Sequence, residues 1–159
     1  MTYARRALVL ATAMLIAVLA PLDAQASHPT RLQPFYADSG DNCRYGVTQG
    51  TLWFDANHPP QPAVVNLQGS VNDRPLPGEP STGCFDDRRY SVAIFTAYAG
   101  STVVSSQRVR ADNGSVPLRI TLGDGITLRI DRADIQVCRF PLYGTWIPAY
   151  CGRPQIYVP

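Results

Sequence analysis

The segment L-R-I-T-L-G-D-G-I-T-L-R-I, residues 118–130, decides the fold class of this chain. Apolar residues occupy every second position on both sides of Gly123-Asp124-Gly125. A period of two is the pattern of a strand that buries one face. A short turn containing Gly and Asp is typical of the connection between two antiparallel strands. We therefore predict a β-hairpin over these residues.

The same alternation recurs along most of the remaining chain. A second turn, at Asp112-Asn113-Gly114, follows one of these runs. The run from Arg89 to Ala99 is interpreted as a strand rather than a helix, because its alternate residues are largely β-branched or aromatic. Together with this run, the strands predicted outside the hairpin are Tyr45–Asp55, Val64–Asn72, Arg89–Ala99, Thr102–Arg110 and Ile135–Phe140.

Seven or eight strands without a convincing helix predict an all-β fold, an antiparallel β-sandwich. We assign it to one domain over residues 43–159. Residues 27–42 contain two prolines, a glycine and an asparagine, and are expected to form an irregular lead-in to that domain. Asp73–Gly83, with three prolines, is expected to be a long loop whose role the sequence does not define.

The N-terminus has the three parts of a secretory signal peptide over residues 1–26. Arg5 and Arg6 precede an apolar run, Ala7–Ala20, and Ala24-Gln25-Ala26 supplies the small residues of a cleavage site. The run is shorter than the roughly 18 apolar residues that a membrane span needs. We expect cleavage before Ser27, a mature chain of about 133 residues without a membrane span, and a secreted, extracellular protein.

The charge of the chain argues against nucleic-acid binding. All 14 basic residues are arginine, and with 12 acidic residues the formal net charge is +2. Loss of the signal peptide would lower this excess further. A nucleic-acid binder relies on a strong positive field, so we expect no nucleic-acid partner.

Four cysteines, all beyond the signal peptide, predict two disulfides in an exported protein. Three pairings are open. Cys138–Cys151 is favoured because a short segment brings these residues together at low entropic cost, and Cys43–Cys84 follows by elimination.

Two resemblances bear on the fold. The C-terminal pattern V-C-R-F-P (137–141) with A-Y-C-G-R-P (149–154) resembles the ending of small exported β-sandwich proteins from actinomycete-type bacteria, a group that implies no activity. The segment D-R-A-D-I-Q-V-C (131–138) resembles the approach to the second cysteine of immunoglobulin domains, and Trp53 lies ten residues after Cys43, as a core tryptophan would. The sandwich is thus expected to be immunoglobulin-like in the broad sense.

The immunoglobulin resemblance also implies an alternative set of disulfides, Cys43–Cys138 and Cys84–Cys151. The chain departs from the immunoglobulin pattern at Gln136, which stands where the corner tyrosine belongs.

Sequence motifs of catalysis and metal binding are missing. There is no G-x-S-x-G, H-E-x-x-H, C-x-x-C or nucleotide-binding glycine loop. Asp86-Asp87 is the densest acidic pair, but the adjacent arginines favour local ion pairs. His28 and His58 lie in apparent loops, and the oxygens of residues 38–42 lack the spacing of a calcium loop. We expect no catalytic residue, no metal and no cofactor.

The candidate binding residues lie in the segment that Cys138 and Cys151 enclose. They are all aromatic: Phe140, Tyr143, Trp146 and Tyr150. Aromatic rings bury a large area on binding with little loss of rotamer entropy. In the alternative interpretation these rings cover the end of the sandwich. Trp53, within a strand, is expected to be a core residue.

Three functions are weighed. The first is a secreted, non-catalytic binding module whose partner is a glycan, the cell envelope or an extracellular protein. The second is a secreted protease inhibitor with Arg139 or Arg153 as specificity residue. The third is a hydrolase on a β-sandwich, carried by aspartates.

Overall fold

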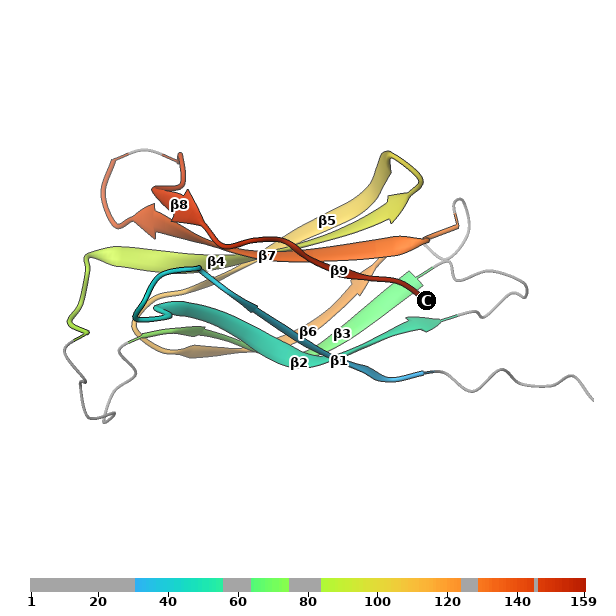
Figure 1. The fold of residues 1–159 in the computed structure, drawn as a ribbon, viewed down its shortest axis with the longest axis horizontal. Coiled ribbons are helices and arrows are strands. Elements are labelled where there is room, and N and C mark those ends of the chain that lie inside the picture. The colour runs from blue at the N-terminus through green and yellow to red at the C-terminus, as the bar shows by residue number, and fades with distance from the viewer. Residues whose placement is uncertain (1–30, 56–63, 75–83, 124–128, 145) are drawn as a thin grey trace, which may run out of the picture.

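A computed structural model describes residues 31–55, 64–74, 84–123, 129–144 and 146–159. These residues form nine β-strands and no helix, arranged as two antiparallel sheets packed face to face (Figure 1). The first sheet has the order β1-β2-β3-β6, and the second β5-β4-β7-β8, with β9 also paired to β7. The strands are β1 Gln33–Asp38, β2 Gly46–Asp55, β3 Val64–Asp73, β4 Arg89–Ala99, β5 Thr102–Ala111, β6 Ser115–Leu122, β7 Arg132–Pro141, β8 Tyr150–Cys151 and β9 Gln155–Tyr157.

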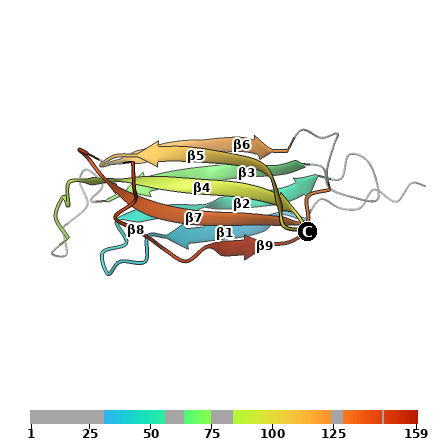
Figure 2. The ribbon, with the colours of Figure 1, turned by 90° about the horizontal axis from the view of Figure 1, so that it is seen from above.

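The chain crosses between the sheets three times. It leaves the first sheet after β3, returns to it after β5, and leaves it again after β6. Strands β2, β3 and β6 then correspond to A, B and E of an immunoglobulin-like sandwich, and β5, β4, β7 and β9 to C′, C, F and G. Seen from above, the second sheet lies over the first and β9 runs beside β1 (Figure 2). The predicted fold class is confirmed.

Alternation in the strands builds one core between the sheets. In β3, Val65, Leu67 and Val71 point inward and are buried, as their spacing predicts. Phe35 and Phe95 meet edge to face inside the core, with ring centroids 6.3 Å apart. The remaining core residues are alternate side chains of the other strands, among them Leu52, Leu118, Leu122, Ile135 and Val137.

Two expectations about the chain's path need correction. The lead-in is not irregular throughout, because residues 33–38 form β1. Proline is a poor residue for a central strand, but Pro34 lies in an edge strand, where the loss of an N–H is tolerated. The first arm of the predicted 118–130 hairpin is β6, which pairs with β3. Residues 124–128 lie outside the described part of the chain, and Arg129 and Ile130 are not in a strand.

Trp53 is also placed differently from the prediction. It alternates with Leu52 and Phe54, which are both buried in the core. Trp53 therefore points to the outer face of the first sheet and is only half-buried. An alternating pattern defines two faces of a strand without telling which of them is inward.

Both favoured disulfides form. Cys138 and Cys151 are directly opposed on β7 and β8, with Cα atoms 4.0 Å apart. Cys43–Cys84 joins the β1–β2 connection to the segment before β4. The alternative pairing implied by the immunoglobulin resemblance is therefore wrong. In the described ranges no helix is long and apolar enough to cross a membrane.

Candidate binding site

Four connections and both disulfides gather at one end of the sandwich, which we call the disulfide end (left in Figure 1). It consists of residues 39–45, 84–88, 112–114 and 142–149. Loops at one end of a sandwich bring together distant parts of the chain, and antibody variable domains bind antigen through such an end.

A fully buried arginine lies beneath this end. Arg139 follows Val137 on the inner face of β7, so its side chain enters the space between the sheets. Its guanidinium forms an ion pair with Asp73 of β3 and lies 2.6 Å from both the Ser91 hydroxyl and a carboxylate oxygen of Asp87. Ser91 in turn donates a 2.8 Å hydrogen bond to Asp73. We call these four residues the Arg139 network.

The Arg139 network holds both sheets in register at the disulfide end. Asp73 also accepts a 2.9 Å hydrogen bond from the backbone N–H of Asn113, which ties the β5–β6 turn to it. Burial lowers the pKa of Arg139, while the nearby Tyr150 and Asp41 act in the opposite direction. An isolated buried charge is costly, so Arg139 and Asp73 each need the other's charge, and Ser91 supplies a further hydrogen bond to both.

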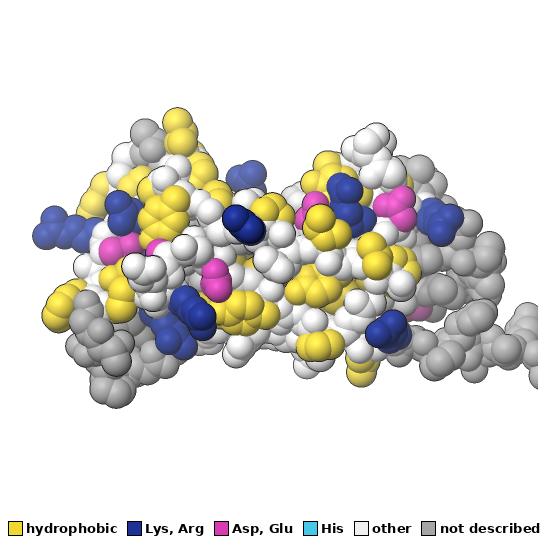
Figure 3. All heavy atoms as spheres, in the orientation of Figure 1, with side chains coloured by type: hydrophobic (Ala, Val, Ile, Leu, Met, Phe, Trp, Pro, Cys, Tyr) yellow, Lys and Arg dark blue, Asp and Glu magenta, His cyan; other side chains and the backbone are white. Residues whose placement is uncertain are grey.

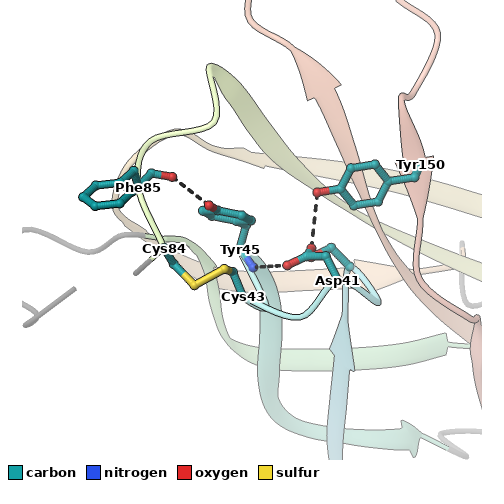
Figure 4. Close-up of a disulfide and its surroundings, with 7 residues drawn as sticks. Asp41, Cys43, Tyr45, Cys84, Phe85 and Tyr150 are labelled. Carbon is teal, nitrogen blue, oxygen red and sulfur yellow. Dashed lines mark hydrogen bonds between the residues drawn. A yellow bond between two sulfur atoms is a disulfide. The ribbon is translucent and has the colours of Figure 1, made fainter. Parts of the chain in front are cut away.

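A second group of hydrogen bonds at the disulfide end is centred on Asp41 (Figure 4). Its carboxylate accepts hydrogen bonds from the Ser39 hydroxyl, from the backbone N–H of Tyr45 at 3.1 Å and from the Tyr150 hydroxyl at 3.4 Å. The Tyr45 hydroxyl donates to the carbonyl of Phe85 at 2.7 Å, beside the Cys43–Cys84 bridge. The β1–β2 connection is thereby fixed to both β8 and the 84–88 segment.

These contacts also perturb the two tyrosines. Burial raises the pKa of Tyr150, and the charge of Asp41 adds to the effect. The pKa of Tyr45 is raised chiefly by burial, with Asp87 and Asp41 contributing. The oxygens of residues 38–42 are thus engaged in turn contacts, and in the described ranges no group of three or more potential ligands could hold a metal ion.

Above this base projects the loop between β7 and β8. Its ends are fixed by hydrogen bonds from Leu142 N–H to the Arg88 carbonyl at 3.0 Å and from Ala149 N–H to the Arg139 carbonyl at 2.8 Å. Gly144, at φ 109, takes a conformation that favours glycine. The space-filling view shows hydrophobic side chains reaching the outer end of this projection (Figure 3).

The predicted binding residues divide into two groups. Tyr143 and Trp146 are 83% and 89% exposed in the projecting loop. Phe140 is buried and stacks on Tyr90 at 5.6 Å, and Tyr150 is half-buried with its hydroxyl toward Asp41. Ile147, 70% exposed, belongs with the first group. We call Tyr143, Trp146 and Ile147 the apex.

Sequence reasoning missed the Arg139 network. Arginine in an alternating strand is usually exposed, and the partners of Arg139 lie 48 to 66 residues earlier in the chain. The available signal was that Val137-Cys138-Arg139-Phe140 interrupts the apolar–polar alternation of β7. The structure buries all four of these residues.

Other candidates are less favourable. A groove of about 410 Å³ runs between β1 and the β8–β9 segment, but the Asp38 carboxylate in its wall already accepts bonds from Tyr36 and Gly40. Asp87 forms ion pairs with Arg89 and Arg139 rather than facing a second carboxylate.

Of the two arginines proposed for protease inhibition, Arg139 is fully buried and Arg153 is exposed. His28, His58 and Glu79, and most of the proline-rich loop, lie outside the described residues. No protein-family model, curated protein or solved structure matches the chain.

Proposed function

We propose that this protein is an exported, non-catalytic binding module that contacts its partner through the apex. The observation that carries the proposal is the exposure of Tyr143, Trp146 and Ile147 at the end of one projecting loop. Single exposed apolar residues are common, but three in one short loop are typical of an interaction site.

The contacts that hold the base of the loop in place favour a binding role for the apex over a structural one. Cys138–Cys151 fixes the two ends of the loop, and the Arg139 network fixes the strands from which the loop starts. A binding surface that is ordered before contact loses less conformational entropy on association. A loop whose aromatic residues only covered the core would keep their rings buried, as Phe140 does.

The two disulfides are consistent with an oxidising environment for this protein, in which it would meet its partner. Together with the signal peptide expected at residues 1–26, they support an extracellular location. The partner we propose is therefore a glycan or a cell-envelope surface.

The test is retention on insoluble partners. Purified protein is incubated with whole cell-envelope fraction, cell-wall polymer, chitin and cellulose, and the bound fraction is measured after sedimentation. Trp146→Ala should abolish retention without changing the midpoint of denaturation, because this side chain is 89% exposed. Val103→Ala, at an exposed position on β5, is the matched control and should bind as the wild type does. Retention that is absent for the wild type, or unchanged in Trp146→Ala, would overturn the proposal.

A further inference from the structure

We propose that the partner of the apex is the surface of a phospholipid bilayer. This inference rests on the proposed function and names the class of surface that the same residues contact. Its basis is the combination of an uncharged projecting loop with a ring of charged side chains at the base of that loop. We call these side chains the collar: Asp86, Asp87, Arg88, Arg89, Arg110 and Asp112.

The chemistry of the loop fits lipid better than sugar. Residues 142–149 read L-Y-G-T-W-I-P-A and include no carboxylate, side-chain amide or charged group. A sugar site combines aromatic faces with side chains that bond the hydroxyls, and this loop offers few such groups. Tryptophan and tyrosine prefer the boundary between lipid chains and headgroups, because their rings are apolar and carry one polar atom.

The apex also suits the depth of that boundary. Ile147 is wholly apolar and would enter the acyl region, while the Tyr143 hydroxyl and the Trp146 indole N–H retain access to headgroups and water. Interfacial segments bury their apolar face only about 5–10 Å deep.

Charged side chains begin at the base of the loop. Leu142 is hydrogen-bonded to the backbone of Arg88, and the guanidinium of Arg89 lies 5.7 Å from the ring centre of Tyr150. Arg110 lies 3.8 Å from the ring centre of Tyr90, which stacks on Phe140. Every one of these cations is arginine, whose planar guanidinium can bind a phosphate through two hydrogen bonds.

Carboxylates accompany these arginines and nearly balance them. Asp87 pairs with Arg89 and Asp112 pairs with Arg110 at 2.8 Å, and Asp86, which accepts a hydrogen bond from the backbone N–H of Arg88, adds a third carboxylate beside them. A zwitterionic headgroup layer carries both negative and positive charges, and the collar offers arginines to the first and carboxylates to the second. Insertion of apolar side chains, rather than attraction to an anionic surface, is then the main source of affinity.

The experiment follows the fluorescence of Trp146 in the mature chain expected after signal-peptide cleavage, residues 27–159. Trp53→Phe, a conservative change at a half-buried position, leaves Trp146 as the only tryptophan. Vesicles of phosphatidylcholine, alone or in equimolar mixture with phosphatidylglycerol, are titrated into this variant, and flotation provides an independent measure of binding. Emission should shift to shorter wavelength and be quenched by lipids brominated near the headgroup.

The variants make the inference specific to the apex. Trp146→Ala, measured by flotation, should lower the partition constant about tenfold, and Ile147→Ser should lower it by a similar factor. Val103→Ala should have no effect. The partition constant should change less than about twofold between the two vesicle compositions and between low and high salt, because the collar is nearly neutral.

Each outcome of these assays supports or overturns the lipid inference. Absence of both the emission shift and flotation overturns the lipid inference, as does vesicle binding that Trp146→Ala leaves unchanged. Binding that requires phosphatidylglycerol and disappears in salt overturns it in favour of electrostatic adsorption. If vesicles fail while a polysaccharide or envelope matrix retains the protein through Trp146, the lipid inference fails and the proposed function stands. If both assays fail, both proposals fail.

Discussion

Replacement of Arg139 by methionine tests whether the buried ion network holds the disulfide end together. Methionine keeps much of the side-chain volume but removes the charge that Asp73, itself fully buried, requires. Breaking a buried ion pair by removing one partner costs about 3–5 kcal/mol. Asp73 retains hydrogen bonds from Ser91 at 2.8 Å and from the Asn113 N–H at 2.9 Å. We therefore expect the lower part of that range, about 3 kcal/mol.

A second substitution gives the result that separates charge from packing. Asp73→Asn in the Arg139→Met background removes the stranded charge and keeps an oxygen for the Asn113 N–H. This double variant should recover about 1–2 kcal/mol relative to Arg139→Met, whereas Asp73→Asn alone should destabilise the protein. Guanidinium denaturation under non-reducing conditions, followed by circular dichroism, measures all four proteins. Arg108→Met, at an exposed position on β5, is the control and should stay within about 0.5 kcal/mol of the wild type. A loss below about 1 kcal/mol for Arg139→Met, or further destabilisation in the double variant, would refute the reasoning.

Three further predictions concern the same end of the molecule. Gly46→Ala should cost about 1–3 kcal/mol, because the new Cβ would lie 2.5 Å from the Ser91 hydroxyl; Gly114→Ala, whose nearest contact would be 3.7 Å away, should be nearly neutral in the same denaturation assay. Replacing both cysteines of Cys138–Cys151 by alanine should lower the free energy of unfolding by about 3 kcal/mol, the chain-entropy value for a separation of 13 residues, and an unchanged denaturation midpoint would contradict this. The raised pKa of Tyr150 means that the folded state holds this proton more tightly than the unfolded state, so its contribution to stability is complete below the ordinary value of about 10 and is lost as pH rises through the folded pKa. The denaturant concentration at the midpoint should therefore decrease as the pH is raised through this alkaline range. The decrease should be smaller in Tyr150→Phe.

Much of the architecture could be predicted because it depends on local patterns. Alternation located β3, β4 and β6, and the fourteen-residue span from Cys138 to Cys151 was short enough to favour that bridge. Sheet membership could not be predicted in the same way. The turn at residues 112–114 is present, with Asn113 at φ 45, but it carries the chain from one sheet to the other. A short polar turn looks the same in sequence whether or not its strands pair.

The candidate site was predicted only in part, because burial depends on contacts between distant segments. Phe140 and Trp146 are equally aromatic in the sequence, yet one has Tyr90 of β4 beneath it and the other extends beyond the sheet. Arg139 is buried because Asp73, Ser91 and Asp87 meet it from three separate segments. The sequence shows that these residues are present, but it does not show that the fold brings them together.

The Cys138–Cys151 bridge has a consequence for how this fold can vary. It holds the two backbone ends of the loop with Cα atoms 4.0 Å apart, whatever sequence joins them. The apex side chains, moreover, make little contact with the core. The apex residues Tyr143, Trp146 and Ile147 can therefore be exchanged for other side chains at small cost to the sandwich, whereas Leu142 packs on the Tyr90–Phe140 cluster. The sandwich is therefore suited to act as a scaffold on which the segment between the two cysteines can be replaced by design.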